Sequence, residues 1–197
     1  MTRFVRLAAP AALALTLGAC GSLLGGGKPP ATLFTVTSNA PAAAPVRTAA
    51  VGETVTVRNP VVPKALRTNR VAVELGATQV QYVANLQLVD TPDRLFQDLV
   101  EETLRRMTSR VVLDPNQSTL DPGLVVTGQL NHFGYDAMQG LVVVQYDASL
   151  ATQGGTHVET RRFEATAPAD GTAGTVSAGL NVAANQVAQQ VAQWIGG

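Results

Sequence analysis

The chain is poor in the residue types that carry chemistry or covalent cross-links. Cysteine occurs once, as Cys20, so no disulfide can form within the chain. Histidine occurs only as His132 and His157, and no H-E-x-x-H pattern or comparable spacing of metal ligands is present. A G-x-S-x-G nucleophile motif is also missing. We therefore expect no catalytic residue, no cofactor-binding residue and no metal ligand, and we predict that the chain is not an enzyme.

Long apolar runs and excess basic charge are also lacking. The apolar run Leu7–Leu17 is about half of the roughly 20 residues that a transmembrane helix needs. The formal net charge is zero, and it becomes −2 once Arg3 and Arg6 leave with residues 1–19. This balance excludes the strongly basic surface that is typical of nucleic-acid-binding proteins. Neither a permanent membrane-spanning helix nor a nucleic-acid partner is therefore expected.

The N-terminus does contain an export signal followed by a lipid attachment motif. Arg3 and Arg6 form its basic end, Leu7–Leu17 forms its apolar run, and small residues precede Cys20. Leu-Gly-Ala-Cys, at residues 17–20, matches the bacterial lipobox, in which the cysteine thiol receives diacylglycerol before cleavage on its N-terminal side. We predict a signal peptide at residues 1–19 and a lipid anchor on Cys20, whose two acyl chains would hold the protein stably on a membrane. An ordinary signal peptide with an incidental cysteine is the alternative.

Glycine and proline dominate the segment that begins at Cys20. Four glycines and two prolines in residues 20–30 predict a flexible tether that spans about 30 Å when extended. The Gly-Gly-Gly-Lys sequence within it lacks the preceding strand and the following helix of a phosphate-binding loop. Residues 31–197 then provide enough chain for a single domain with its own core.

Periodic apolar residues predict seven strands and two helices. Thr91 and Pro92 are the residue types of a helix N-cap and a first helical position, and apolar residues then recur at three- and four-residue spacing. A second apolar stripe predicts a helix over about Ala173–Ile195. Segments 38–50 and 114–123 are expected to be loops, the first of them mobile. The predicted strands are Ala31–Thr37, Glu53–Arg58, Arg70–Leu75, Thr78–Ala84, Leu124–Phe133, Leu141–Ala151 and Val158–Ala167.

These elements predict an α+β fold, in which two amphipathic helices pack on one face of a largely antiparallel sheet. Trp194 completes the apolar face of the second helix, so core packing is favoured over a role as a binding anchor. Glu101 and Glu102 are interpreted as a solvated helix face. His132 is interpreted as a surface or edge-strand residue, with a contact to Asp136 as the alternative.

Seven short segments also share a pattern with one known family, in the same order along the chain. In order and spacing they resemble the auxiliary lipoproteins of ABC-type transport systems, a family that includes the outer-membrane lipoprotein of a paraquat-inducible (Pqi) intermembrane transport system. The family often has a tryptophan six residues after the tyrosine of the third segment, where this chain has Leu88, so a partner contact made by that tryptophan would be altered. The segments are Leu33–Val36, Leu66–Val73, Val80–Tyr82, Asp90–Leu95, Gly128–Phe133, Arg161–Ala165 and Trp194–Ile195.

The resemblance implies a component of an ABC- and MCE-type system that moves phospholipid between the inner and outer membranes. Its partners would be a periplasmic MCE-domain protein, an inner-membrane permease and an ATPase. The chain would dock the MCE-domain protein, or form the end of its tunnel, at the periplasmic face of the outer membrane, and a homo-oligomeric ring is one assembly consistent with this role. Gly21 after Cys20, with no aspartate there, agrees with sorting to the outer membrane. A lipid-binding carrier and an outer-membrane assembly lipoprotein are the alternatives.

Overall fold

The computed structural model describes residues 32–42, 47–50, 52–116 and 123–196. They belong to the second of two units of the chain, Thr32–Gly197. The predicted signal peptide, the predicted lipidation site Cys20 and the predicted tether lie outside the described residues. Two α-helices, α1 (Pro92–Met107) and α2 (Ala173–Gly196), accompany seven strands. The strands are β1 (Thr54–Val57), β2 (Arg70–Gly76), β3 (Gln79–Gln87), β4 (Val111–Leu113), β5 (Leu124–Asp136), β6 (Leu141–Thr152) and β7 (His157–Pro168).

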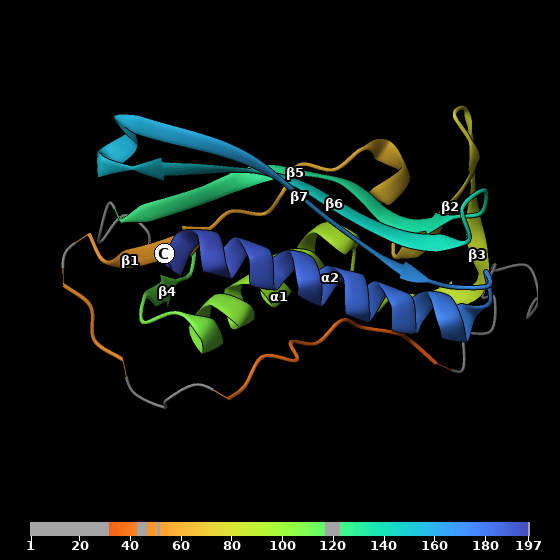
Figure 1. The fold of residues 1–197 in the computed structure, drawn as a ribbon, viewed down its shortest axis with the longest axis horizontal. Coiled ribbons are helices and arrows are strands. Elements are labelled where there is room, and N and C mark those ends of the chain that lie inside the picture. The colour runs from red at the N-terminus through yellow and green to blue at the C-terminus, as the bar shows by residue number, and fades with distance from the viewer. Residues whose placement is uncertain (1–31, 43–46, 51, 117–122, 197) are drawn as a thin grey trace, which may run out of the picture. The chain divides into compact units, whose positions relative to one another are not determined.

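The strands form one mixed sheet with β5 at its centre (Figure 1). One edge of β5 pairs antiparallel with β6 over almost its whole length, and β7 continues the sheet antiparallel to β6. The other edge of β5 is shared, because β1 runs parallel to its first residues and β2 runs parallel to its last residues. β4 then pairs parallel with β1, and β3 pairs antiparallel with β2. The predicted strands Arg70–Leu75 and Thr78–Ala84 correspond to the paired strands β2 and β3. The two parallel pairings with β5 join segments that periodicity alone cannot connect.

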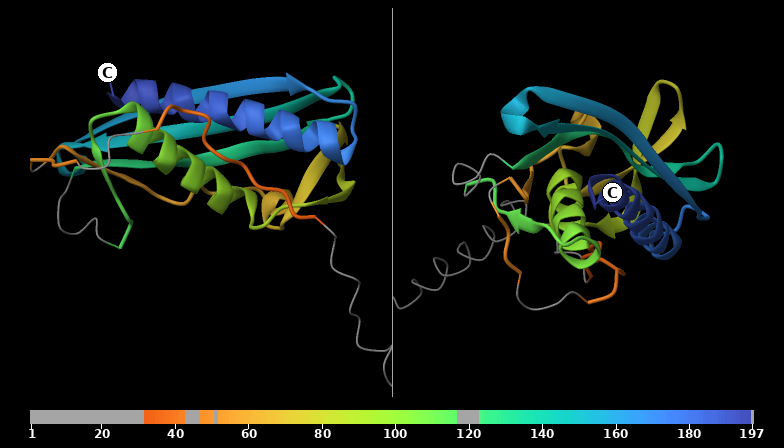
Figure 2. Two further views of the ribbon diagram at one scale, coloured as in Figure 1. Left: turned by 90° about the horizontal axis from the view of Figure 1, so that it is seen from below. Right: turned by 60° about the vertical axis from the view of Figure 1, so that its left-hand side comes forward.

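Both helices lie side by side against one face of this sheet (Figures 1 and 2). On α1, the apolar stripe includes Phe96, whose ring packs 5.0 Å from the ring of Tyr146 in β6. On α2, Gly179 sits so close to the sheet that a Cβ there would lie 2.8 Å from Cγ2 of Val142. The alanine-rich buried face of α2 follows from this approach, because only small side chains fit between a helix and a sheet at that distance. The predicted α+β fold with two helices on one face is confirmed.

The ends of the two helices differ in how their backbone groups are satisfied. Thr91 occupies the N-cap of α1 as predicted, but its side chain makes no capping hydrogen bond. At the start of α2, the Thr172 hydroxyl accepts a hydrogen bond from the backbone N–H of Thr175, as an N-cap residue does. Asp170 accepts hydrogen bonds from the Thr175 hydroxyl and the Thr172 backbone, which lower the pKa of its carboxyl group to about 2.

Residues 34–40, which we call the N-terminal strap, cross the outer side of the helix pair. Asn185 of α2 is only 1% exposed, and its side-chain amide donates to the carbonyl of Thr37 while its oxygen accepts from the N–H of Asn39. Asn181 accepts a hydrogen bond from the N–H of Thr37, and Arg106 of α1 donates to the carbonyl of Ala40. The strap therefore fastens α1 to α2 through hydrogen bonds to its own backbone.

The strap corrects two predictions for this region. The segment Ala31–Thr37 was expected to be a strand, but in its described part only Phe34 makes a β-bridge, to Leu88. The strand ends there because the following backbone groups bind helix side chains instead of a neighbouring strand. The segment 38–50 was expected to be a mobile loop, yet its first residues belong to the strap, and residues 43–46 lie outside the described residues.

Three further features differ from the sequence-based expectations. β4 falls directly after α1 and was not predicted, because three residues are too few to establish a period. Leu88 is 2% exposed and pairs with Phe34 of the strap, so this position is part of the core and not of a partner contact. Glu101 is 9% exposed rather than solvated, and burial raises the pKa of its carboxyl group although Gln97 and Arg105 donate hydrogen bonds to it.

Candidate functional site: the uncovered face of the sheet

The alternation of side chains along β6 separates two different faces of the sheet. Val142, Val144 and Tyr146 are buried against the helices. Val143 and Asp147, with the opposite parity, point to the other face and are partly exposed. We call this second face the uncovered face, because α1 and α2 leave it free. The short helix η1 (Lys64–Leu66) lies over its β2–β5 part, on the side of the sheet opposite α1 and α2 (Figure 1).

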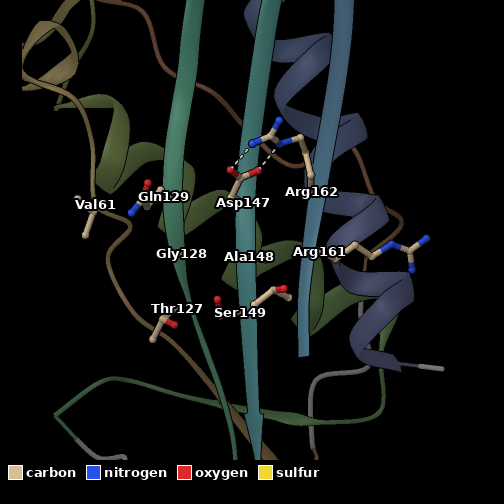
Figure 3. Close-up of a pocket in the computed structure, with 10 residues that line it drawn as sticks. Val61, Thr127, Gly128, Gln129, Asp147, Ala148, Ser149, Arg161 and Arg162 are labelled. Atoms are coloured by element: carbon tan, nitrogen blue, oxygen red, sulfur yellow. Dashed lines mark hydrogen bonds and ion pairs between the residues drawn. The ribbon is translucent and has the colours of Figure 1, made fainter. Parts of the chain in front are cut away.

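A groove of about 760 Å³ runs across the uncovered face over β5, β6 and β7 (Figure 3). Its walls present hydroxyl, amide and charged groups on a sheet floor that includes Gly128 and Ala148. Val61 closes one side, because its backbone pairs with β5 at Gln129. The lining residues are Val61, Thr127, Gly128, Gln129, Asp147, Ala148, Ser149, Thr160, Arg161 and Arg162.

The strongest polar interaction in the groove joins Asp147 of β6 to Arg162 of β7. These residues lie opposite each other in the antiparallel register, and the guanidinium Nε and Nη2 donate to the two carboxylate oxygens over 2.6 and 2.7 Å. Asn131 also donates to Asp147, over 2.9 Å. It can do so because a bulge in β5 leaves Asn131 outside the regular pairing with β6. The hydrogen bonds from Arg162 hold the pKa of the Asp147 carboxyl group below its usual value.

Arg161 has different surroundings from its neighbour Arg162. Figure 3 shows it extending to the side of α2, away from the Asp147–Arg162 pair. Its guanidinium carbon lies 5.5 Å from the centre of the Phe163 ring, within the range of a cation–π contact. Together with Gln190, Gln193 and Trp194 it lines a smaller crevice of about 290 Å³ beside β7. Arg161 and Arg162 therefore line both the groove and this crevice.

Trp194 was predicted to pack in the core, and the structure places it at the boundary of the core. Its ring packs 5.5 Å from that of Phe163, and its indole N–H donates to the carboxylate of Glu159 over 2.9 Å. One side of the ring is therefore buried while the polar edge reaches the surface. This arrangement is typical of a tryptophan at the margin of an interaction surface.

The two histidines lie on different strands and have different surroundings. His132 lies on the central strand β5, not on an edge strand, and its Nδ1 is 2.9 Å from a carboxylate oxygen of Glu74 rather than near Asp136. His157 is exposed at the first position of β7. Within the residues that the structure describes, no group of three or more potential metal ligands is found. The chemistry of the uncovered face is that of hydrogen bonding and charge pairing.

These features define an α+β domain with one face closed by helices and one face offering a broad polar groove. The sequence profile of a known family, the "ABC-type transport auxiliary lipoprotein component", matches residues 34–192. The chain belongs to this family, as the resemblance of its segments predicted. The description of this family is that of a transport component associated with ABC systems. No helix within the described ranges is both long and apolar enough to span a bilayer.

Solved structures with the same fold have diverged strongly in sequence. A crystal structure of a DUF330 protein from Xanthomonas campestris superposes with a TM-score of 0.64 at 16% identity, covering 84% of this chain and 94% of the other. The crystal structure of an uncharacterized protein gives a TM-score of 0.61 at 18% identity, covering 74% and 94% of the two chains. At this identity the likeness establishes the fold alone. A search of curated proteins finds no significant match.

Proposed function

We propose that this chain is the lipid-anchored auxiliary component of an ABC- and MCE-type system that moves phospholipid between the inner and outer membranes. In this role it docks the periplasmic MCE-domain protein, whose movement of lipid is coupled to an inner-membrane permease and ATPase. The observation that carries the proposal is membership of the auxiliary lipoprotein family over residues 34–192. The more specific partner and cargo follow from the resemblance of the sequence to the Pqi branch of that family.

The anchor in this proposal is a diacylglycerol thioether on Cys20. The lipobox at residues 17–20 supports it, and residues 20–30 form a tether between the anchor and the domain. Gly21 favours retention at the outer membrane, with the domain on the periplasmic side. Metabolic labelling with a palmitate analogue tests this step, because Cys20→Ala removes the attachment atom. Label that persists in Cys20→Ala would show that Cys20 is not the site.

The docking surface in this proposal is the groove on the uncovered face. Protein interfaces tolerate polar and wet surfaces when hydrogen bonds are matched, and arginine and tryptophan are enriched in them. The groove is lined by the polar side chains of Thr127, Gln129 and Ser149, and its margin carries Arg161 and Trp194. The opposite side of the molecule is closed by two helices and the N-terminal strap, so it offers a partner less access to the sheet.

Site-specific photocrosslinking in intact cells tests the docking. A photoreactive amino acid at Thr160, which lines the groove, is compared with one at Gln186, which is exposed on α2. We expect a crosslink from position 160 to a protein that contains MCE domains, and no such crosslink from position 186. Capture of the MCE-domain protein from position 186 alone would place docking on the helices. Capture of only outer-membrane assembly proteins from position 160 would replace the transport role by the assembly role.

A further inference from the structure

A second hollow on the uncovered face is apolar, unlike the groove. It lies between η1 and the β2–β5 part of the sheet, has a volume of about 240 Å³ and does not share lining residues with the groove. Pro63 and Ala65 cover it from the η1 side, Ala72 and Val143 form its floor, and Val80 closes it from β3. We call it the η1 pocket.

The local backbone explains why the η1 pocket stays open. Gly134 of β5 lies opposite Ala72 of β2, and a Cβ on Gly134 would come within 2.5 Å of the Ala72 carbonyl oxygen. Two residues with almost no side chain therefore face the space beneath η1. The roof is held in place because the Tyr82 hydroxyl donates to the carbonyl of Ala65 over 3.3 Å. The pocket is thus bounded on one side by η1, which is held in place, and on the other by residues whose side chains are too small to fill the space.

The mouth of the η1 pocket is polar and mainly acidic. Glu74 and His132 face each other there over 2.9 Å, and both side chains are about 40% exposed. Asp136 and Asn131 complete the rim. The Asp136 carboxylate also accepts hydrogen bonds from Met138 and Gln139, and the Asn131 amide donates to Asp147. No arginine or lysine lines the pocket in the described part of the chain. A ligand that enters would leave its head group beside two carboxylates and one histidine.

We infer that the η1 pocket binds the end of one acyl chain of an amphiphile whose head group carries an amine. Burial of hydrocarbon is favourable at roughly 25 cal/mol per Å², and the lining of the pocket is largely apolar. An apolar cavity of about 150 Å³ can hold a benzene ring, so the larger η1 pocket fits a segment of roughly eight to ten carbons. A positively charged amine complements Glu74 and Asp136, whereas a free carboxylate would be repelled.

This inference rests on the proposed function only for the source of the ligand, which would be a transported phospholipid such as one with an ethanolamine head. The linings of the acyl site and of the docking groove have no residue in common, and the hydrogen bond from Asn131 to Asp147 connects the two. Binding of lipid can therefore fail while crosslinking to the MCE-domain protein succeeds, and the reverse also holds. The two proposals are distinguishable for this reason.

Methyl NMR on the full chain tests the inference, with Cys20→Ser introduced to remove the predicted lipid attachment. The probe is lauroyl-lysophosphatidylethanolamine below its critical micelle concentration, and dodecanoate is the comparison ligand with the same chain length. We expect saturable shifts of the Val80, Val143 and Ala72 methyl signals and none for Val125, which lies on β5 outside both hollows. Dodecanoate is expected to bind at least several-fold more weakly.

Two matched substitutions locate the binding. Val143→Phe fills the floor of the η1 pocket and should weaken binding at least tenfold, whereas Val125→Phe makes the same change at another half-buried valine and should leave affinity unchanged. Val80→Phe, at a side chain that is half exposed, fills the pocket with less risk to folding. Absence of shifts at the pocket methyls, or equal loss of binding in Val125→Phe, would overturn the acyl site. Equal affinity for dodecanoate would overturn the assignment of an amine-bearing head group.

Discussion

The two faces of the sheet show how one set of strands supports two different surfaces. On the covered side, every second residue of β6 from Val142 to Leu150 is buried, and the helices and the N-terminal strap add two further layers. On the uncovered side, the intervening residues form a polar groove and an apolar pocket. The covered side is therefore constrained by packing and the uncovered side by the partner that it meets. Substitutions should affect stability on the first side and binding on the second.

Gly128→Ala should give the largest loss of stability. Its Cβ would lie 2.3 Å from the backbone oxygen of Asp147 and 2.7 Å from the Tyr146 ring, so the β5–β6 pairing must shift. We expect the free energy of unfolding to fall by about 3 kcal/mol, measured by urea denaturation. Thr127→Ala, at the exposed neighbouring position, should change it by less than about 0.5 kcal/mol. Equal stability of the two variants would show that the sheet accommodates the extra methyl group.

Asn185→Ala tests the outermost layer of the covered side. The substitution removes a buried amide and leaves the carbonyl of Thr37 and the N–H of Asn39 without their partner. We expect a loss of about 2 kcal/mol in the free energy of unfolding, because two hydrogen bonds are removed and each contributes about 1 kcal/mol. Gln186→Ala, exposed on the same helix, is the control and should be close to neutral. If the free energy of unfolding of Asn185→Ala equals that of the wild type, these hydrogen bonds to the strap contribute nothing to stability.

Tyr146→Phe probes a single hydrogen bond beneath the sheet. The Tyr146 hydroxyl donates to the carbonyl of Thr127 over 3.1 Å, and burial of the side chain raises the pKa of that hydroxyl. Removing the hydroxyl keeps the packing of the ring on Phe96, so we expect the free energy of unfolding to fall by about 1 kcal/mol in denaturation experiments. Tyr135→Phe removes a hydroxyl for which no hydrogen bond is found among the described residues. If the two variants lose the same stability, the hydrogen bond of Tyr146 is not the cause.

Asp147→Asn should give the smallest change in stability, although it removes the ion pair with Arg162 in the groove. The side chains of Arg162 and Asp147 are 63% and 35% exposed, so solvent screens the pair and its loss should cost little stability at neutral pH. Because Arg162 lowers the pKa of Asp147 from its usual value of 3.8, the stabilisation is present above that value and is lost as pH falls through the folded-state pKa. The free energy of unfolding of the wild type should therefore fall more steeply below about pH 4 than that of the variant. If the free energy of unfolding depends on pH in the same way in the wild type and in Asp147→Asn, the pair has no role in stability.

The sequence predicted those features in which the pattern is local. α1 was predicted because apolar residues repeat on one side of Pro92–Met107, and β5, β6 and β7 because alternation persists over ten or more residues. The family was recognisable because its segments keep their order. Glu101 was misassigned because it lies beside Gln97, whose side chain reaches the Val57 carbonyl of β1, and this tertiary contact leaves no periodic signal.

The groove could be predicted only in part. Arg161 and Arg162 were visible as a family-like segment, and alternation places them on opposite sides of β7. Which of the two meets Asp147 depends on the register with β6. Asn131 was not predicted as a groove residue, because a bulge in β5 turns it towards Asp147. A bulge of one residue has no reliable signature in a single sequence.

Local patterns in this sequence therefore determined the elements, the fold class and the family, because helix and strand periods are properties of neighbouring residues. Tertiary structure alone decided which face of the sheet remained open and which segment became the strap. Those outcomes depend on contacts between residues far apart in the chain, such as Thr37 with Asn185 and Gly134 with Ala72. The alternation of apolar and polar residues along a strand shows which residues share a face of the sheet. The layer that covers that face is set by the packing of the whole domain.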